Sequence, residues 1–147
     1  MEKRRIAIGS DHAGFALKEK IKSHLSQQNF EITDVGTYSE ERADYSDYGH
    51  LVANAILEKK VFAGILICGS GNGINMTANK HAGIRAALCW KEEIALLARQ
   101  HNDANILSLP ARFISDDEAF KCVAIFFKTD FEGGRHCGRV EKIDIKK

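Results

Sequence analysis

The chain has 147 residues, of which 44% are hydrophobic and 28% charged, and its formal net charge is +1 at pH 7. We expect residues 1–147 to form one domain, because a chain of this length builds a single core. The small net charge gives no overall field that would favour nucleic acid or a membrane surface. No apolar run approaches the ~20 residues that span a bilayer, and the first residues lack the long apolar region of a signal peptide. We therefore expect a cytoplasmic protein.

Strand-like and helix-like segments alternate along the chain. Apolar runs predict five strands at residues 5–9, 31–35, 62–68, 84–89 and 105–109. Helices are predicted over residues 15–27, 46–59, 74–80, 94–100 and 119–128, and a capping box at residues 115–118 opens the last of them. This alternation indicates an α/β fold in which helices cover both faces of a parallel sheet. A ligand is then expected in the crevice at the carboxyl ends of the strands.

A glycine-rich loop follows the third predicted strand. It consists of Gly69, Ser70, Gly71, Asn72 and Gly73. Backbone N–H groups in such a loop, placed before a helix, can bind an anion or an oxyanion that forms during a reaction. A tight strand-to-helix turn would use the same residues. The loop is not a dinucleotide-binding fingerprint, because Ile74 stands where the last glycine of that motif belongs. It also lacks a Walker lysine and the arginine of a phosphatase-type cysteine loop.

Cys68 is the last residue of the strand that leads into this loop. The other cysteines are Cys89, Cys122 and Cys137; none forms a C-x-x-C pair, so we expect reduced thiols and no zinc site. Cys68 could be an inert core thiol. Its place before a helix N-terminus instead predicts a lowered thiol pKa. A thiolate beside an oxyanion cradle can attack a carbonyl or remove a proton from the adjacent carbon.

Three further polar residues follow predicted elements, and each has a structural alternative. Asp11 can hydrogen-bond a sugar hydroxyl or cap the next helix, and His12 can bind phosphate or lie on the surface. His101 is a candidate general acid because its ordinary pKa of about 6.5 suits proton transfer. It can also simply complement the C-terminus of its helix.

Arginines near the end of the chain suggest a phosphate site. If a helix begins at Arg135, then Arg135 and Arg139 share a face and can converge on a phosphate. A solvated basic turn is the alternative reading. Arg112 is a further single candidate.

Five segments together resemble the ribose-5-phosphate isomerase B family, which includes the galactose-6-phosphate isomerase subunits. They are GSDHAGFALK (9–18), DVGTYSEERADYSDYG (34–49), GILICGSGNGINMTANKHAGIRAAL (64–88), ARQHNDANILSLPAR (98–112) and FEGGRHCGRVEKI (131–143). The resemblance covers nearly the whole chain. It implies a metal-independent, cofactor-free aldose–ketose isomerase on a Rossmann-like three-layer α/β/α sandwich with a five-stranded parallel sheet. It also implies a homodimer or homotetramer with shared active sites, in which residues 131–147 pack on a partner subunit.

The resemblance also implies roles for individual residues. Cys68 would move a proton between C1 and C2 of the sugar, with Ser70 assisting transfer between the oxygens, and His101 would open the furanose ring. The amides from Gly69 to Gly73 would hold the enediolate. Asp11 and Asn102 would contact sugar oxygens. The phosphate would be bound by His12, Arg112, Arg135 and Arg139. Some family members use a glutamate after the glycine loop as the base; Ile74 cannot accept a proton, so this chain resembles the cysteine type.

The expected reaction is the interconversion of ribose 5-phosphate and ribulose 5-phosphate through a cis-enediol. Isomerisation of a six-carbon sugar phosphate, such as allose or galactose 6-phosphate, is the alternative within the same chemistry. A non-catalytic phosphosugar-binding module would have lost the base or the acid, whereas Cys68 and His101 are both present. A redox-sensing role for Cys68 has no resolving cysteine close in sequence. Since one chain carries the base, the acid and both terminal arginines, we expect a self-sufficient homo-oligomer.

Overall fold

The strands and helices of the chain follow the predicted alternation. The computed structural model describes residues 2–146. Its strands are β1 (Arg4–Ser10), β2 (Phe30–Gly36), β3 (Ala63–Cys68), β4 (Ala86–Leu88) and β5 (Ile106–Pro110). Its helices are α1 (Phe15–Ser26), α2 (Tyr45–Leu57), α3 (Asn72–Ala78), α4 (Glu92–Asn102), α5 (Asp116–Lys128) and α6 (His136–Glu141), with a 3-10 turn η1 at Ala111–Phe113. The Ser115 side chain accepts a hydrogen bond from the Glu118 amide, which confirms the predicted cap of α5.

The five strands form one parallel sheet in the order β2-β1-β3-β5-β4. In the register, Ser10 of β1 lies beside Ile67 of β3, and Cys68 of β3 lies beside Pro110 of β5. The carboxyl ends of the three central strands therefore meet at one edge of the sheet. This confirms the predicted parallel sheet and brings the segments after β1, β3 and β5 together.

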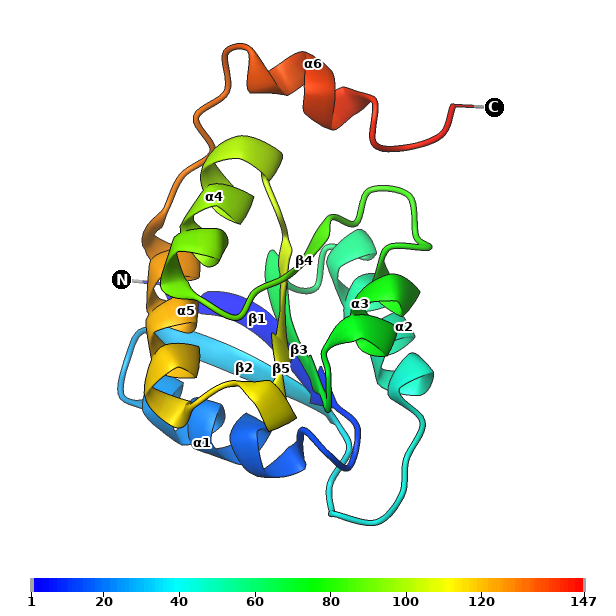
Figure 1. The fold of residues 1–147 in the computed structure, drawn as a ribbon, viewed down its shortest axis with the longest axis vertical. Helices are drawn as coiled ribbons and strands as arrows, with labels where there is room; N and C mark the ends of the chain where they lie inside the picture. The colour runs from blue at the N-terminus through cyan, green and yellow to red at the C-terminus, as the bar shows by residue number, and fades with distance from the viewer. Residues whose placement is uncertain (1, 147) are drawn as a thin grey trace.

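Helices cover both faces of the sheet, which gives the expected three layers (Figure 1). One core lies under α1, α4 and α5, and the second lies under α2 and α3. Every residue of β3 is buried, because helices pack on both of its faces. Full burial of a side chain such as Ile65 contributes about 1.5–3 kcal/mol relative to exposure.

Strand β4 is shorter than predicted, at three residues instead of residues 84–89. It lies at the sheet edge, where other groups take the place of a neighbouring strand. The Asn79 side chain donates to the Ala86 carbonyl and accepts from the Ala86 amide, at 2.9 and 2.8 Å. The Arg85 amide donates to the side chain of Asn105. Side-chain amides thus satisfy this edge and end the strand early.

Helix α6 lies beyond the end of α4, apart from the helices that cover the sheet (Figure 1). It contacts α4, and the His136 ring of α6 stacks on His101 of α4 with ring centroids 4.3 Å apart. The last described residues continue from α6 and include the largely exposed Ile145. The chain therefore ends in an arm held mainly against one end of the molecule.

A fully buried lysine orders the segment after β2. Lys18 of α1 has no exposed side-chain surface and donates to Asp34 at 2.6 Å and to Glu19 at 2.9 Å. Lys22 also donates to Asp34, at 2.7 Å. Burial alone would raise the pKa of Asp34, but the hydrogen bonds from Lys18 and Lys22 outweigh it, so the pKa is lowered. The other Asp34 oxygen accepts from the Gly36 amide, which fixes the start of the loop that leads to α2.

Candidate active site

The glycine loop is packed tightly between the end of β3 and the start of α3. Gly71 has φ +77°, and a Cβ there would lie 2.4 Å from the Leu88 side chain. A Cβ on Gly73 would lie 2.5 Å from the Tyr45 ring. A side chain at either position would push the backbone away from its neighbours, so glycine is required for this path. Tyr45 therefore forms part of the wall of the loop, and its side chain remains partly exposed.

Cys68 lies at the base of the loop and is 4% exposed. Burial raises the pKa of its thiol, and the negative charge of Asp11 acts in the same direction. Backbone N–H groups of Ile74, Gly71 and Ser70 point to the sulfur and favour the thiolate, but they do not outweigh burial. The prediction of a lowered pKa is therefore wrong for this chain: desolvation exceeds the effect of the short helix that follows.

Asp11 and His12 follow β1 at the same edge. The Asp11 amide donates to the Ile67 carbonyl of β3, and its carboxylate accepts from the Gly14 amide at 3.1 Å. This hydrogen bond closes the turn before α1, whose N-cap is Gly14 without a side-chain cap, so Asp11 does not cap the helix itself. The charge of Asp11 also acts on the Cys68 thiol. His12 Nδ1 lies 3.2 Å from the Ala43 amide and 3.3 Å from the Ala43 carbonyl. In the tautomer in which Nδ1 accepts from the amide, the Nε2 of the neutral ring carries the hydrogen and can donate it to a ligand.

The glycine loop brings two further candidates to this edge. The Arg112 amide donates to the Gly69 carbonyl at 3.0 Å, and its guanidinium lies against the same glycine, where a Cβ would be 3.1 Å from Nη1. Ser70 Oγ accepts from both the amide and the side chain of Asn72 at 3.3 Å. A thiol, a hydroxyl and a guanidinium therefore lie at one loop of backbone amides, and the Asp11 carboxylate and the His12 imidazole follow the neighbouring strand β1 at the same end of the sheet.

The remaining candidates lie at the amino-terminal ends of the strands, opposite the edge of the sheet that carries the glycine loop. His101 and Asn102 end α4, shortly before β5 begins at Ile106, whereas Cys68 lies beside Pro110 at the other end of β5. At about 3.3 Å per residue, β5 separates these edges by about 13 Å. Arg135 and Arg139 lie with α6, which contacts α4. One chain thus does not bring His101, Asn102 and the two terminal arginines to its own Cys68.

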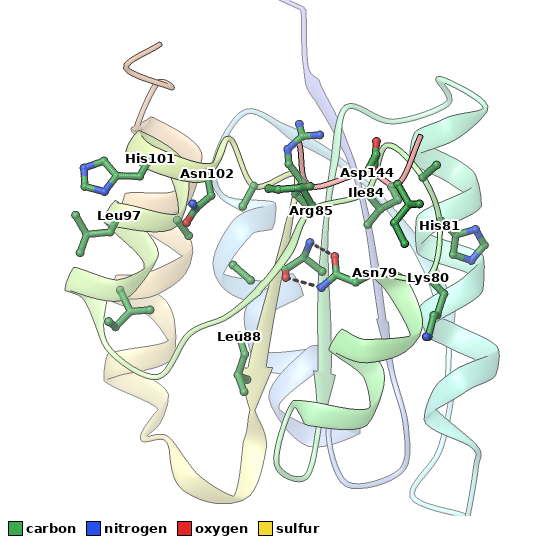
Figure 2. Close-up of a pocket in the computed structure, with 18 residues that line it drawn as sticks. Asn79, Lys80, His81, Ile84, Arg85, Leu88, Leu97, His101, Asn102 and Asp144 are labelled. Atoms are coloured by element: carbon green, nitrogen blue, oxygen red, sulfur yellow. Dashed lines mark hydrogen bonds between the residues drawn. The ribbon is translucent and has the colours of Figure 1, made fainter. Parts of the chain in front are cut away.

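A cavity of about 1010 Å³ lies beside this second group of candidates (Figure 2). It extends between α3, β4, α4 and the C-terminal arm, and its lining includes His101, Asn102, Arg85 and Asp144. Cys68 does not line it.

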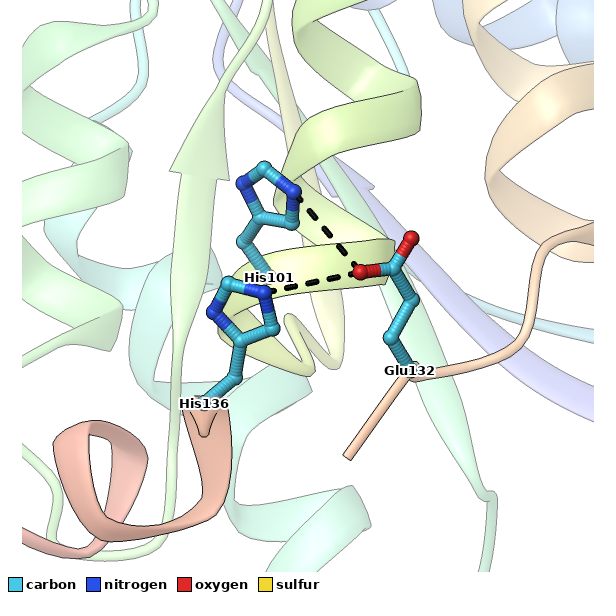
Figure 3. A group of neighbouring side chains, drawn as sticks. All are labelled: His101, Glu132 and His136. Carbon is cyan, nitrogen blue, oxygen red and sulfur yellow. Dashed lines mark ion pairs between the residues drawn. The ribbon is translucent and has the colours of Figure 1, made fainter. Parts of the chain in front are cut away.

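His101 has two neighbours that the sequence did not single out (Figure 3). Glu132 Oε1 lies 3.9 Å from His101 Nε2 and 3.5 Å from His136 Nε2. Burial and the positive charges nearby, including Arg135, lower the pKa of His136. The i,i+4 spacing of Glu132 and His136 was visible in the sequence, but their approach to His101 depends on the packing of α6 on α4. These three groups are also where a metal ion could be held.

None of the helices in residues 2–146 combines the length and the apolar character that crossing a bilayer requires. All four cysteines are free thiols, as expected.

Comparisons with known proteins agree over nearly the whole chain. A model of the family described as Ribose/Galactose Isomerase matches residues 6–143. Over 140 residues, the chain is 46% identical to ribose-5-phosphate isomerase B of Escherichia coli (strain K12), covering 95% of this chain and 94% of that protein. It is similar to the crystal structure of the Thermotoga maritima ribose 5-phosphate isomerase of this type, with a TM-score of 0.94, 52% identity and coverage of 96% and 97%. The structure of the Mycoplasma genitalium protein with bound ribulose 5-phosphate gives a TM-score of 0.92 at 44% identity, covering 97% and 95%.

Proposed function

The chain belongs to the ribose/galactose isomerase family, and on this premise we propose that it interconverts ribose 5-phosphate and ribulose 5-phosphate. The relatives that carry the name ribose-5-phosphate isomerase B match over more than nine tenths of their length, and one of them holds ribulose 5-phosphate. The observation that carries the proposal in this chain is the thiol of Cys68 beneath three backbone amides. A base next to an oxyanion cradle is what proton transfer beside a carbonyl requires.

Cys68 is the proposed base. In the direction from aldose to ketose, the thiolate removes the proton from C2, the electrons form the enediolate, and the thiol returns the proton to C1. The raised pKa makes the thiolate a stronger base for a weakly acidic C–H bond, while it lowers the thiolate fraction at neutral pH. The amides between Gly69 and Gly73 stabilise the charge on the enediolate oxygens, and the Ser70 hydroxyl passes a proton between them.

We propose that each active site is built from two copies of the chain, as a homodimer or a homotetramer. The reaction needs an acid that opens the furanose ring, and His101 is the proposed acid. Because His101 and Cys68 lie at opposite edges of one sheet, His101 of a second subunit has to complete the site. The C-terminal segment 131–147 of this single-domain chain then packs on that subunit. Its helix α6 lies beyond the end of α4 (Figure 1).

The same arrangement accounts for the substrate-binding residues. His12 and Arg112 belong to the subunit that supplies Cys68, and they bind the phosphate from one side. Arg135 and Arg139 arrive with His101 from the second subunit and bind it from the other side. Charge-assisted contacts from several such groups give tight and directional phosphate binding. Asp11 and the Asn102 of the second subunit contact sugar oxygens.

The proposed chemistry uses only protein groups, so it proceeds without a metal or cofactor. We also propose a cytoplasmic location, which the four free thiols support because structural disulfides are typical of oxidising compartments.

The family also contains isomerases of six-carbon sugar phosphates, so the decisive experiment compares substrates. Turnover of ribose 5-phosphate, allose 6-phosphate and galactose 6-phosphate is measured with EDTA present, for the wild type and Cys68→Ala. We expect the highest kcat/KM for ribose 5-phosphate and none for the variant. A higher kcat/KM for a hexose phosphate would leave the proposed isomerase mechanism standing and refute ribose 5-phosphate as the preferred substrate. Turnover by Cys68→Ala would remove the thiol from its role as base.

A further inference from the structure

Three groups that commonly bind metal ions converge where α4 meets the C-terminal arm (Figure 3). His101, Glu132 and His136 each offer one ligand atom, and these atoms all lie within 4.8 Å of one another. They come from the end of α4, from the segment before α6, and from the first turn of α6. The cluster is therefore formed by the tertiary structure and not by one local motif.

Hydrogen bonding does not account for the arrangement. The distances from Glu132 Oε1 to the two Nε2 atoms, 3.5 and 3.9 Å, exceed the 2.7–3.2 Å or so of an N–H···O hydrogen bond. His136 is 4% exposed, yet its Nε2 has no hydrogen-bond partner within residues 2–146. A buried polar atom without a partner is costly. The Glu132 carboxylate lies 3.5 Å from this atom, an ion-pair distance that requires a protonated ring to be attractive.

The gap has the dimensions of a coordination sphere. In a tetrahedral site with Zn–N and Zn–O bonds of about 2.0–2.1 Å, ligand atoms lie about 3.3–3.4 Å apart. The two rings are stacked with an angle of 16° between their planes, so a rotation of one ring about its Cβ–Cγ bond is needed for both to point to one ion. Two imidazoles and a carboxylate suit zinc and cobalt, and they leave one position open for water.

We propose that His101, Glu132 and His136 bind a divalent transition-metal ion of the zinc type, and that the bound ion inhibits the enzyme. The ion takes the Nε2 lone pair of His101, which then cannot carry the proton that opens the furanose ring. The inhibitory half of this inference rests on the proposed function. The binding half does not, because it depends only on the three side chains.

Binding is tested by titrating the metal-free protein with Co²⁺ and recording its visible absorption. We expect one ion per chain with the intense bands of a four-coordinate site. His136→Gln and Glu132→Gln should each weaken binding at least about tenfold, since loss of a ligand should cost no less than loss of an outer-shell partner. Should the buried substitution His136→Gln prevent folding, Glu132→Gln still tests the site, because Glu132 is about half exposed and its substitution leaves the core intact.

Two control variants exclude other sites for the ion. Cys68→Ala should bind Co²⁺ as the wild type does, and so should His81→Gln, which disrupts the second close histidine pair, His50 Nδ1 to His81 Nε2 at 2.7 Å. Loss of binding in either control would overturn the proposed site. Wild-type affinity in both His136→Gln and Glu132→Gln would overturn it as well.

Inhibition is tested by adding Zn²⁺ to the enzyme during turnover of ribose 5-phosphate and then removing it with EDTA. We expect reversible loss of activity in the wild type. For Glu132→Gln, inhibition is measured against the metal-free rate of this variant. The Zn²⁺ concentration that halves this rate should rise by the same factor as the Co²⁺ dissociation constant of the variant. If Co²⁺ binds at the three residues but Zn²⁺ does not slow turnover, the inhibitory role is refuted. If no sugar phosphate is turned over, the proposed function fails, while the Co²⁺ titration still decides the metal site.

Discussion

Mixing two inactive variants tests the proposal that each active site takes residues from two chains. One variant is Cys68→Ala, which removes the base at the carboxyl edge of the sheet. The other is His101→Asn, which removes the acid at the opposite edge. Each variant alone should have almost no isomerase activity, because every site in its own oligomer lacks one of the two groups.

The expected activity of the mixture follows from the positions of the two residues. In a mixed dimer, one site combines both substitutions, and the other combines an intact Cys68 with an intact His101. When equal amounts of the two chains pair at random, half of the dimers are mixed, so about one quarter of the wild-type sites are restored. The chains are co-expressed with different tags, and native mass spectrometry measures the mixed fraction. Turnover per chain is then compared with that of the wild type.

Arg112→Ala provides the matched control. Arg112 lies beside Gly69, at the same edge as Cys68, so a mixture of Arg112→Ala and Cys68→Ala contains no intact site. Its activity should not exceed the mean of the two parents. If the mixture of Cys68→Ala and His101→Asn remains inactive although mixed oligomers are present, the shared site is refuted. Recovery in the Arg112 control would refute the assignment of residues to the two edges.

Three further perturbations follow from the local structure. The rate at which iodoacetamide alkylates Cys68 is measured against pH by mass spectrometry, with the exposed Cys137 as internal reference. Its pH midpoint should lie above the free-thiol value of about 8.5, because burial raises the pKa of Cys68. A midpoint below that value would contradict the expectation. Gly71→Ala should lower the free energy of unfolding in urea by about 1–3 kcal/mol, since φ is +77° and the new Cβ would lie 2.4 Å from a neighbouring methyl group; an unchanged value would show that the loop adapts. Asp34→Asn should cost about 3 kcal/mol at pH 7, because it leaves Lys18 buried beside a neutral amide. The lowered pKa of Asp34 gives the wild type stability that is complete above the unfolded value of about 3.9 and is lost as the pH falls through the lower folded value, so the difference between the two proteins should shrink below pH 4.

The sequence alone determined the class of fold and singled out the glycine loop as a candidate oxyanion site. Strands and helices leave local periodicities, and a run of glycines between a strand and a helix has few structural meanings. The sequence therefore named Cys68, Ser70, Asp11, His12 and the glycines as candidates, and the family resemblance suggested roles for them that stay predictions. The loop candidates do gather at one edge, because parallel strands place their carboxyl ends together.

Only the tertiary structure decided where His101, the proposed acid, lies relative to Cys68. His101 is 33 positions after Cys68 in the printed chain, but α4 returns it to the opposite edge of the sheet. The sign of the Cys68 pKa shift also depended on the structure, because it is a competition between burial and three amides. The approach of Glu132 and His136 to His101, and the burial of Lys18, are further contacts between distant segments. Periodicity is a property of residues that are close in sequence, whereas desolvation and charge act between residues that are close in space. The sequence could therefore name the candidate side chains, but the folded chain set the burial and the charges around them.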